Sequence, residues 1–153
     1  MQHKLEFTVQ IQRPVSVVYA HLAQPRNFIG LQPLLSSISS VEEFSINNKR
    51  GCKYETVEDF RVGSIPVFHN RIHVQTVLTE PDQQIDSIVY SKPNIRLDVH
   101  YQFTSQDGGT LLIEQMLISA PALVSSYVIS TAQRVQEQTL ANLKRRLEAE
   151  QAA

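Results

Sequence analysis

The chain has 153 residues, 42% of them hydrophobic and 19% charged, with a formal net charge of −1. This length fits one domain with a substantial core, so we expect a single domain over residues 1–153. A near-neutral charge exerts no long-range attraction on nucleic acid, which we therefore do not expect as a partner. No apolar run approaches the roughly 18 residues that cross a bilayer, and the start of the chain lacks an apolar signal core. With Cys52 as the only cysteine, these features predict a cytoplasmic protein without a membrane span.

The first part of the chain predicts a strand followed by two short helices. Residues 4–12 alternate between polar and apolar side chains, which is the period of a half-buried strand. Pro14 suits the first turn of a helix, and apolar residues then recur at helical spacing. Pro25 ends this helix, and a second short helix or turn is predicted over residues 25–31.

The middle of the chain predicts strands joined by turns. Turn-forming residues recur at 47–51, 63–66, 80–83, 91–94 and 106–109. The runs between them are rich in Val, Ile, Thr, Tyr and Phe, and each is too short to hold a crossover helix. Neighbouring strands should therefore pair antiparallel as a meander.

A long helix is predicted at the end of the chain. From Val124 to Leu147 apolar and small residues recur in steps of three and four, and no Gly or Pro interrupts residues 122–153. We expect a helix of about 25 residues. Only this helix can cover the apolar face of the sheet. The predicted fold class is thus α+β, a curved antiparallel sheet of about seven strands wrapped around the C-terminal helix, with two short helices after the first strand.

The last part of this helix carries opposite charges close together. Lys144, Arg145 and Arg146 precede Glu148 and Glu150. The cations lie near the C-terminal end, where the helix dipole favours them. We interpret these charges as a solvated tail rather than a binding patch.

The sequence offers little for metal or cofactor chemistry. His69 and His73 would share a metal ion on a helix, but in a strand this spacing separates them by about 13 Å. We therefore predict that both face outward and that no metal site exists. The chain has five glycines and no glycine-rich phosphate loop or nucleophile elbow, so no cofactor is expected. Nothing near Cys52 in sequence activates its thiol, which we predict to be inert.

Candidate site residues are those on the predicted inner faces of the strands. Alternation places Glu58 inward together with Tyr54 and Phe60, and it places Asn70 inward together with Ile72. An unpartnered carboxylate in a dry core costs several kcal/mol. Glu58 must therefore be paired, protonated or exposed to a wet cavity, as an acid/base group or polar anchor. The alternatives are a register shift that turns it outward, or a structural ion pair.

Further candidates come from a later strand and from the long helix. Tyr101 and Tyr127 are either hydrogen-bonding groups of a pocket or core residues with the hydroxyl at a rim. Thr131 lies near the inner face of the helix, together with Gln138 and Thr139. These polar residues favour a cavity, because a solid core would hold Leu or Val there.

Glu114 is not placed by its pattern. The strand predicted to begin at Thr110 is apolar on both faces, so alternation does not assign Glu114 to either side. Its burial is left open.

Four segments mark the order of these elements: residues 11–19 (IQRPVSVVY), 23–28 (AQPRNF), 32–34 (QPL) and 119–121 (SAP). In this order the chain resembles the START-like superfamily, whose helix-grip fold occurs in polyketide cyclases and dehydratases, lipid-transfer domains and coenzyme Q-binding proteins. Many relatives carry an acidic residue and a tryptophan where this chain has Gln24 and Phe28. The resemblance implies a cavity between sheet and helix for a small hydrophobic ligand that is lipid-, isoprenoid- or polyketide-like.

Three functions are compatible with these observations. The first is a carrier or sensor that binds such a molecule unchanged. The second is a cyclase- or dehydratase-type enzyme, which an inward carboxylate beside tyrosine and asparagine favours. The third is a protein-interaction module, which a filled core favours. The resemblance does not choose between enzyme and carrier, because the superfamily contains both.

Overall fold

The computed structural model describes residues 2–62 and 65–152, and the side chains of residues 2–59 and 70–150. The elements are β1 (Gln2–Ile11), α1 (Val15–Leu22), the 3-10 helix η1 (Pro25–Phe28), β2 (Leu35–Ile46), β3 (Lys49–Val62), β4 (Ile65–Glu80), β5 (Gln84–Ser91), β6 (Ile95–Gln106), β7 (Gly109–Ser119) and α2 (Ala122–Ala152).

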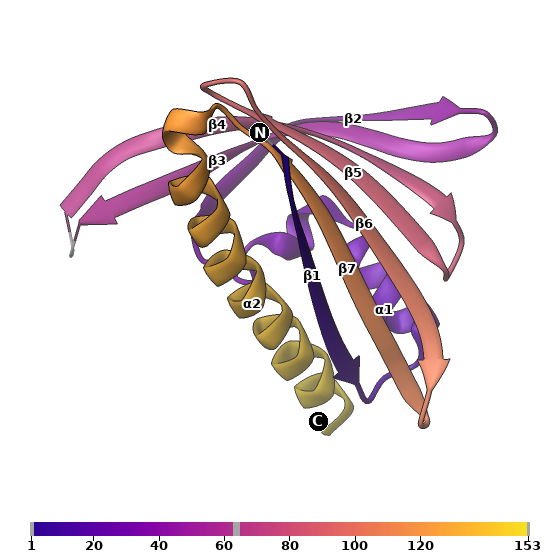
Figure 1. Cartoon of the computed structure of the whole chain (residues 1–153). Helices are drawn as coiled ribbons and strands as arrows, with labels where there is room; N and C mark the ends of the chain where they lie inside the picture. The colour runs from indigo at the N-terminus through magenta and orange to yellow at the C-terminus, as the bar shows by residue number, and fades with distance from the viewer. Residues whose placement is uncertain (1, 63–64, 153) are drawn as a thin grey trace.

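The strands form one curved antiparallel sheet, and the predicted fold class is confirmed. The seven strands lie in the order β1-β7-β6-β5-β4-β3-β2, so each neighbouring pair is a hairpin except β1 with β7. That pair joins the start of the chain to its last strand. The long helix α2 runs beside β1, and the sheet fans away from it (Figure 1). The short helix α1 packs against β6 and β7, and η1 packs against β2.

The hairpin turns form where the sequence predicts them. Asn47 and Asn48 connect β2 to β3, and both have positive φ angles of 51° and 64°. Asp107 and Gly108 connect β6 to β7, with φ angles of 52° and 77°. Two consecutive residues with positive φ are typical of the tight hairpin turns that match strand twist, and Asn, Asp and Gly tolerate a positive φ best. The turn predicted at residues 63–66 begins with two residues that lie outside the described part of the chain.

Burial along α2 changes from its start to its end. Leu143 and Leu147 are fully buried against β1 and α1, in a core cluster that includes Ile11 and Val18. Near the start of the helix Val124, Val128 and Thr131 are only half-buried, although Ser125 is buried, and Val135 is the first apolar helix residue to be buried. The helix has 31 residues, longer than the predicted 25, because no residue breaks it. Among the described residues no helix is long and apolar enough to cross a membrane.

The interpretation of the charged helix end as a solvated tail is wrong for two of its cations. The Lys144 ammonium donates a hydrogen bond to the Gln10 carbonyl at 2.6 Å. The Arg146 guanidinium donates to the carbonyls of Asn27 at 2.7 Å and Ile29 at 3.0 Å. These bonds fasten the end of α2 to β1 and to the η1 segment. Backbone carbonyls that lose water on folding need such hydrogen-bond donors. Here the carbonyls lie far in sequence from Lys144 and Arg146, so the sequence pattern did not show these contacts.

Candidate functional site

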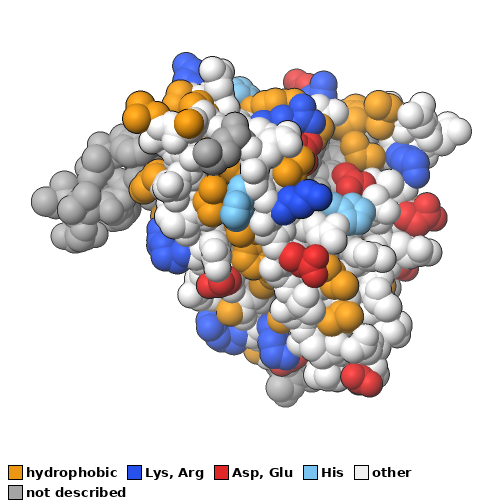
Figure 2. Space-filling model, viewed as in Figure 1, with side chains coloured by type: hydrophobic (Ala, Val, Ile, Leu, Met, Phe, Trp, Pro, Cys, Tyr) orange, Lys and Arg blue, Asp and Glu red, His pale blue; other side chains and the backbone are white. Residues whose placement is uncertain are grey.

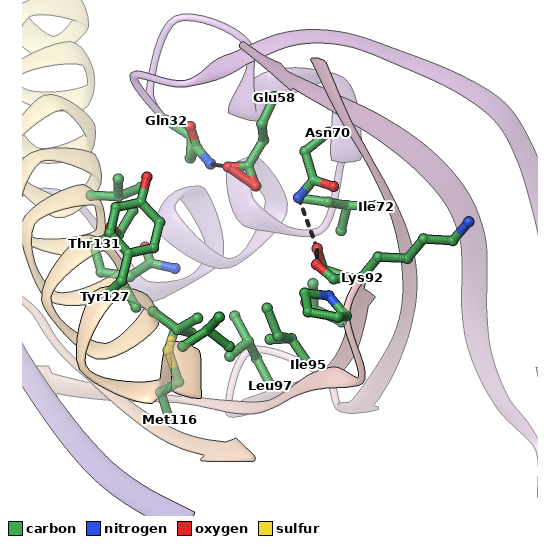
Figure 3. Close-up of a pocket in the computed structure, with 18 residues that line it drawn as sticks. Gln32, Glu58, Asn70, Ile72, Lys92, Ile95, Leu97, Met116, Tyr127 and Thr131 are labelled. Atoms are coloured by element: carbon green, nitrogen blue, oxygen red, sulfur yellow. Dashed lines mark hydrogen bonds between the residues drawn. The ribbon is translucent and has the colours of Figure 1, made fainter. Parts of the chain in front are cut away.

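A cavity of about 330 Å³ lies between the first half of α2 and the sheet. Figure 3 shows its residues projecting from the strands and from the helix toward a common space. Its walls are mainly apolar and include Ile72, Val89, Ile95, Leu97, Met116 and Val128. The cavity exists because α2 and the sheet pack closely only near the end of the helix.

A smaller, second cavity of about 140 Å³ continues under the sheet. Tyr54 and Tyr101 line this inner cavity but not the outer one. Three polar residues line both: Gln32, Glu58 and Gln136. They therefore lie where the outer and inner cavities meet.

On the α2 side the rim of the outer cavity is mainly apolar. Hydrophobic side chains gather at the surface over the first turns of α2 (Figure 2). Leu123 is 97% exposed and Tyr127 is 58% exposed, and the Tyr127 side chain also lines the cavity. Tyr127 thus lies at the rim and is not the core residue of one of its two sequence interpretations, and its role as a hydrogen-bonding group stays a prediction.

Glu58 lies on the face of β3 that points to the cavity, so a register shift that turns it outward does not occur. The Gln32 amide nitrogen donates a 2.9 Å hydrogen bond to the Glu58 carboxylate. The side-chain oxygen of Gln32 accepts a hydrogen bond from the Leu34 backbone nitrogen at 2.6 Å, which orients the side-chain amide toward Glu58. Burial raises the pKa of Glu58, and the Gln32 hydrogen bond opposes part of this rise.

Asn70 lies directly across the β3–β4 pair from Glu58. Its amide nitrogen donates to the Ser91 hydroxyl at 2.8 Å, a bond that ties β4 to the end of β5 (Figure 3). Ile72 and Thr131 line the same outer cavity. The structure therefore brings Glu58, Asn70, Ile72 and Thr131 around one space, and their roles in binding stay predictions.

Other predicted residues lie elsewhere. The Phe60 side chain is outside the described side chains. Thr139 is buried, but its hydroxyl donates to the Val135 carbonyl within the helix at 2.7 Å. Gln138 is exposed and bonds Asn142 at 2.9 Å. Of the three polar helix residues interpreted as signs of a cavity, only Thr131 lines one of the two cavities described above.

Sequence reasoning missed Gln32 and Gln136. The side-chain oxygen of Gln136 is buried and has no hydrogen-bond partner in the described part of the chain. Helical spacing could have found it, since Gln136 follows the cavity residue Ala132 by four positions. No pattern could have found Gln32, which lies in an irregular segment after η1 and reaches Glu58 only through the fold.

Glu114, which the sequence does not place, is fully buried. Its neighbours across the strand pairs are Phe7 and Tyr101. Neither carboxyl oxygen has a hydrogen-bond partner of good geometry in the described part of the chain, although the Tyr101 side chain interacts with the group. Burial raises the pKa of Glu114 to about 8, and Tyr101 opposes this rise only partly. Glu114 lines neither cavity.

His73 faces away from the cavity, as predicted, and its side chain is 63% exposed. Its Nδ1 atom lies 3.4 Å from the Glu55 carboxylate. The His69 side chain is outside the described residues. Among the described side chains, no three His, Cys, Asp or Glu residues lie close enough to hold a metal ion.

No family model and no curated protein matches the chain. Solved structures do match it. The di-domain ARO/CYC StfQ from the steffimycin biosynthetic pathway aligns with a TM-score of 0.75 and 14% identity, over 100% of this chain and 53% of StfQ. The di-domain ARO/CYC BexL from the BE-7585A biosynthetic pathway aligns with a TM-score of 0.73 and 16% identity, over 94% of this chain and 49% of BexL.

A START superfamily protein from Mycobacterium smegmatis aligns with a TM-score of 0.69 and 11% identity, over 96% of this chain and 98% of that protein. This chain thus spans about half the length of the two di-domain proteins and nearly all of the third. At these identities the likeness establishes the fold. The chain has the START-like, helix-grip fold that its sequence resembles.

Proposed function

We propose that this protein binds a small, mainly apolar molecule of the lipid, isoprenoid or polyketide type in the cavity between α2 and the sheet. The observation that carries the proposal is the outer cavity, whose volume of about 330 Å³ and apolar walls with few polar groups match those of small-molecule sites. The START-like neighbours support a ligand-binding or cyclase fold. A protein-interaction module with a filled core would not need this space.

Filling the cavity should weaken binding. Ala132 lines the outer cavity from α2, and we expect Ala132→Phe to place a ring in the space that the ligand needs. The affinity for the neutral fluorescent probe N-phenyl-1-naphthylamine should fall about tenfold or more, because a close-packed site tolerates little added volume. A fluorescence titration measures the affinity, and a thermal melt verifies that the variant is folded.

Ala141→Phe is the matched control, because Ala141 is exposed on the same helix. Its affinity should stay within about twofold of the original, as for an ordinary surface change. Equal binding by the original protein and both variants would contradict the proposed site.

A cyclase- or dehydratase-type enzyme is the second candidate, and the environment of Glu58 favours it. A general acid or base works best when its pKa lies near the operating pH, and burial moves the pKa of Glu58 in that direction. Glu58 also lies at the junction of the two cavities, where it can reach a ligand in either. In this role the Glu58 carboxylate takes a proton from a bound substrate, and the carboxyl group so formed returns a proton to it, while Asn70 across the strand pair orients the substrate by hydrogen bonding.

Glu58→Gln separates enzyme from carrier. Native mass spectrometry of protein purified from its own host first identifies the bound molecule, and product formation from it is then followed. An enzyme should keep its affinity and lose turnover on the order of 10²-fold. A carrier should form no product in either form and keep its affinity within a few-fold. The control is Glu55→Gln, which changes a β3 residue that pairs with Arg71. If both variants turn over the molecule like the original protein, Glu58 is not a catalytic residue.

A further inference from the structure

Where the two cavities meet, Glu58 is the acidic side chain between two amides, Gln32 and Gln136. Glu58 contributes a carboxylate, and within the described side chains only the Gln32 amide donates to it. Gln136 contributes a buried side-chain oxygen that has no partner in the described part of the chain. Within the described side chains the Glu58 carboxylate thus has one side-chain donor for its two oxygens, which favours a ligand that supplies a further donor.

No cation among the described side chains is directed into this space. Lys92 is the one lysine or arginine in the described lining of the outer cavity. Figure 3 shows its side chain extending away from the cavity, so that its amino group lies on the far side from Glu58. In its ionised form Glu58 therefore supplies the negative charge at the polar end of the cavity.

We propose that the cavity selects an uncharged apolar ligand that carries a hydroxyl group, as an alcohol or a phenol does, and that it rejects carboxylates of the same shape. This inference rests on the proposed function. The ligand hydroxyl donates to the Glu58 carboxylate, and hydrogen bonds to an ionised acceptor are the stronger ones. A ligand carboxylate would bring a second negative charge beside Glu58 in a poorly screened space. An apolar ligand without a hydroxyl would fit, but it would add no donor to the Glu58 carboxylate.

Three probes with one ring system test this selectivity: 2-naphthol, naphthalene and 2-naphthoate. At pH 7.5 the first two are uncharged and the third is an anion. We expect 2-naphthol to bind about tenfold or more tightly than 2-naphthoate, because like charges in close contact are strongly unfavourable. It should also bind about fivefold more tightly than naphthalene, the gain expected from one satisfied hydrogen bond. Isothermal titration calorimetry measures all three affinities.

Glu58→Gln tests whether Glu58 causes the selectivity. The side chain keeps its shape and an acceptor oxygen, so 2-naphthol should bind within about threefold of its original affinity. The affinity for 2-naphthoate should rise about tenfold, because the opposing charge is removed. In the control Glu55→Gln the ratio of the two affinities should not change. If Glu58→Gln does not fold, the probe ratios of the original protein still test the selectivity itself.

The outcomes separate the two proposals. Binding of 2-naphthoate as tight as that of 2-naphthol overturns the selectivity, whatever the variants do. The selectivity is also overturned if all three probes fail to bind while N-phenyl-1-naphthylamine still binds and Ala132→Phe weakens that binding about tenfold or more. The proposed function then stands. Failure of every probe overturns both.

Discussion

Replacing Leu143 with alanine should lower the free energy of unfolding by about 2–5 kcal/mol, the cost of removing a large side chain from a tight core. Leu143 is fully buried in the cluster that holds the second half of α2 against the sheet and α1. Little rearrangement can fill the space, because Leu140 and Leu147 on the same helix are also buried in this cluster. Urea unfolding followed by circular dichroism gives the free energy.

Leu123→Ala is the matched control, because it makes the same chemical change in the same helix at a residue that is 97% exposed. The change in helix propensity is similar at both positions, so the difference between the variants isolates burial. The control should change the free energy of unfolding by about 0.5 kcal/mol or less. Equal losses in the two variants would show that the end of α2 does not pack as described.

The second large effect is a loss of stability with rising pH that depends on Glu114. Its pKa is raised from the usual 4.5 to about 8 in the folded protein. Between these values the unfolded chain releases the proton and the folded protein keeps it, so stability falls as pH rises and the fall levels off above about pH 8. At about 1.4 kcal/mol per pKa unit, the total loss is at most about 5 kcal/mol.

Glu114→Gln should remove this contribution, because its amide stays uncharged at every pH. The variant should therefore gain stability relative to the original protein as pH rises from 5 to 9, which urea unfolding at a series of pH values measures. Taking the difference cancels other titrating groups, such as His21, whose pKa burial and Arg146 lower. The control is Glu42→Gln at an exposed position. Parallel stability curves for Glu114→Gln and the original protein would contradict the assignment.

The sequence patterns predicted the elements and the sides of the strands on which residues lie. Alternation of apolar and polar residues correctly placed Glu58 and Asn70 on the cavity side of β3 and β4, and His73 on the opposite side. Asn47-Asn48 and Asp107-Gly108 correctly marked two hairpin turns. These features depend on the geometry of one strand or turn, in which a residue's side is set by its neighbours along the chain.

The contacts between distant elements were decided by the tertiary structure alone. Gln32 meets Glu58 and Arg146 meets Asn27 because packing brings an irregular segment and a helix end to partners far away in sequence. The sequence did not place Glu114, because its strand β7 is apolar on both faces. The packing of Phe7 and Tyr101 around Glu114 decides that its face of β7 is the buried one.

The sequence by itself determined that a helix with an apolar stripe covers a sheet with an apolar face. It did not determine how closely the two approach along their length. That spacing depends on the sum of side-chain volumes from many elements at once, and a periodic pattern holds no information on it. The tertiary structure closes the gap at Leu143 and leaves it open at Val128, and the cavity follows from that difference.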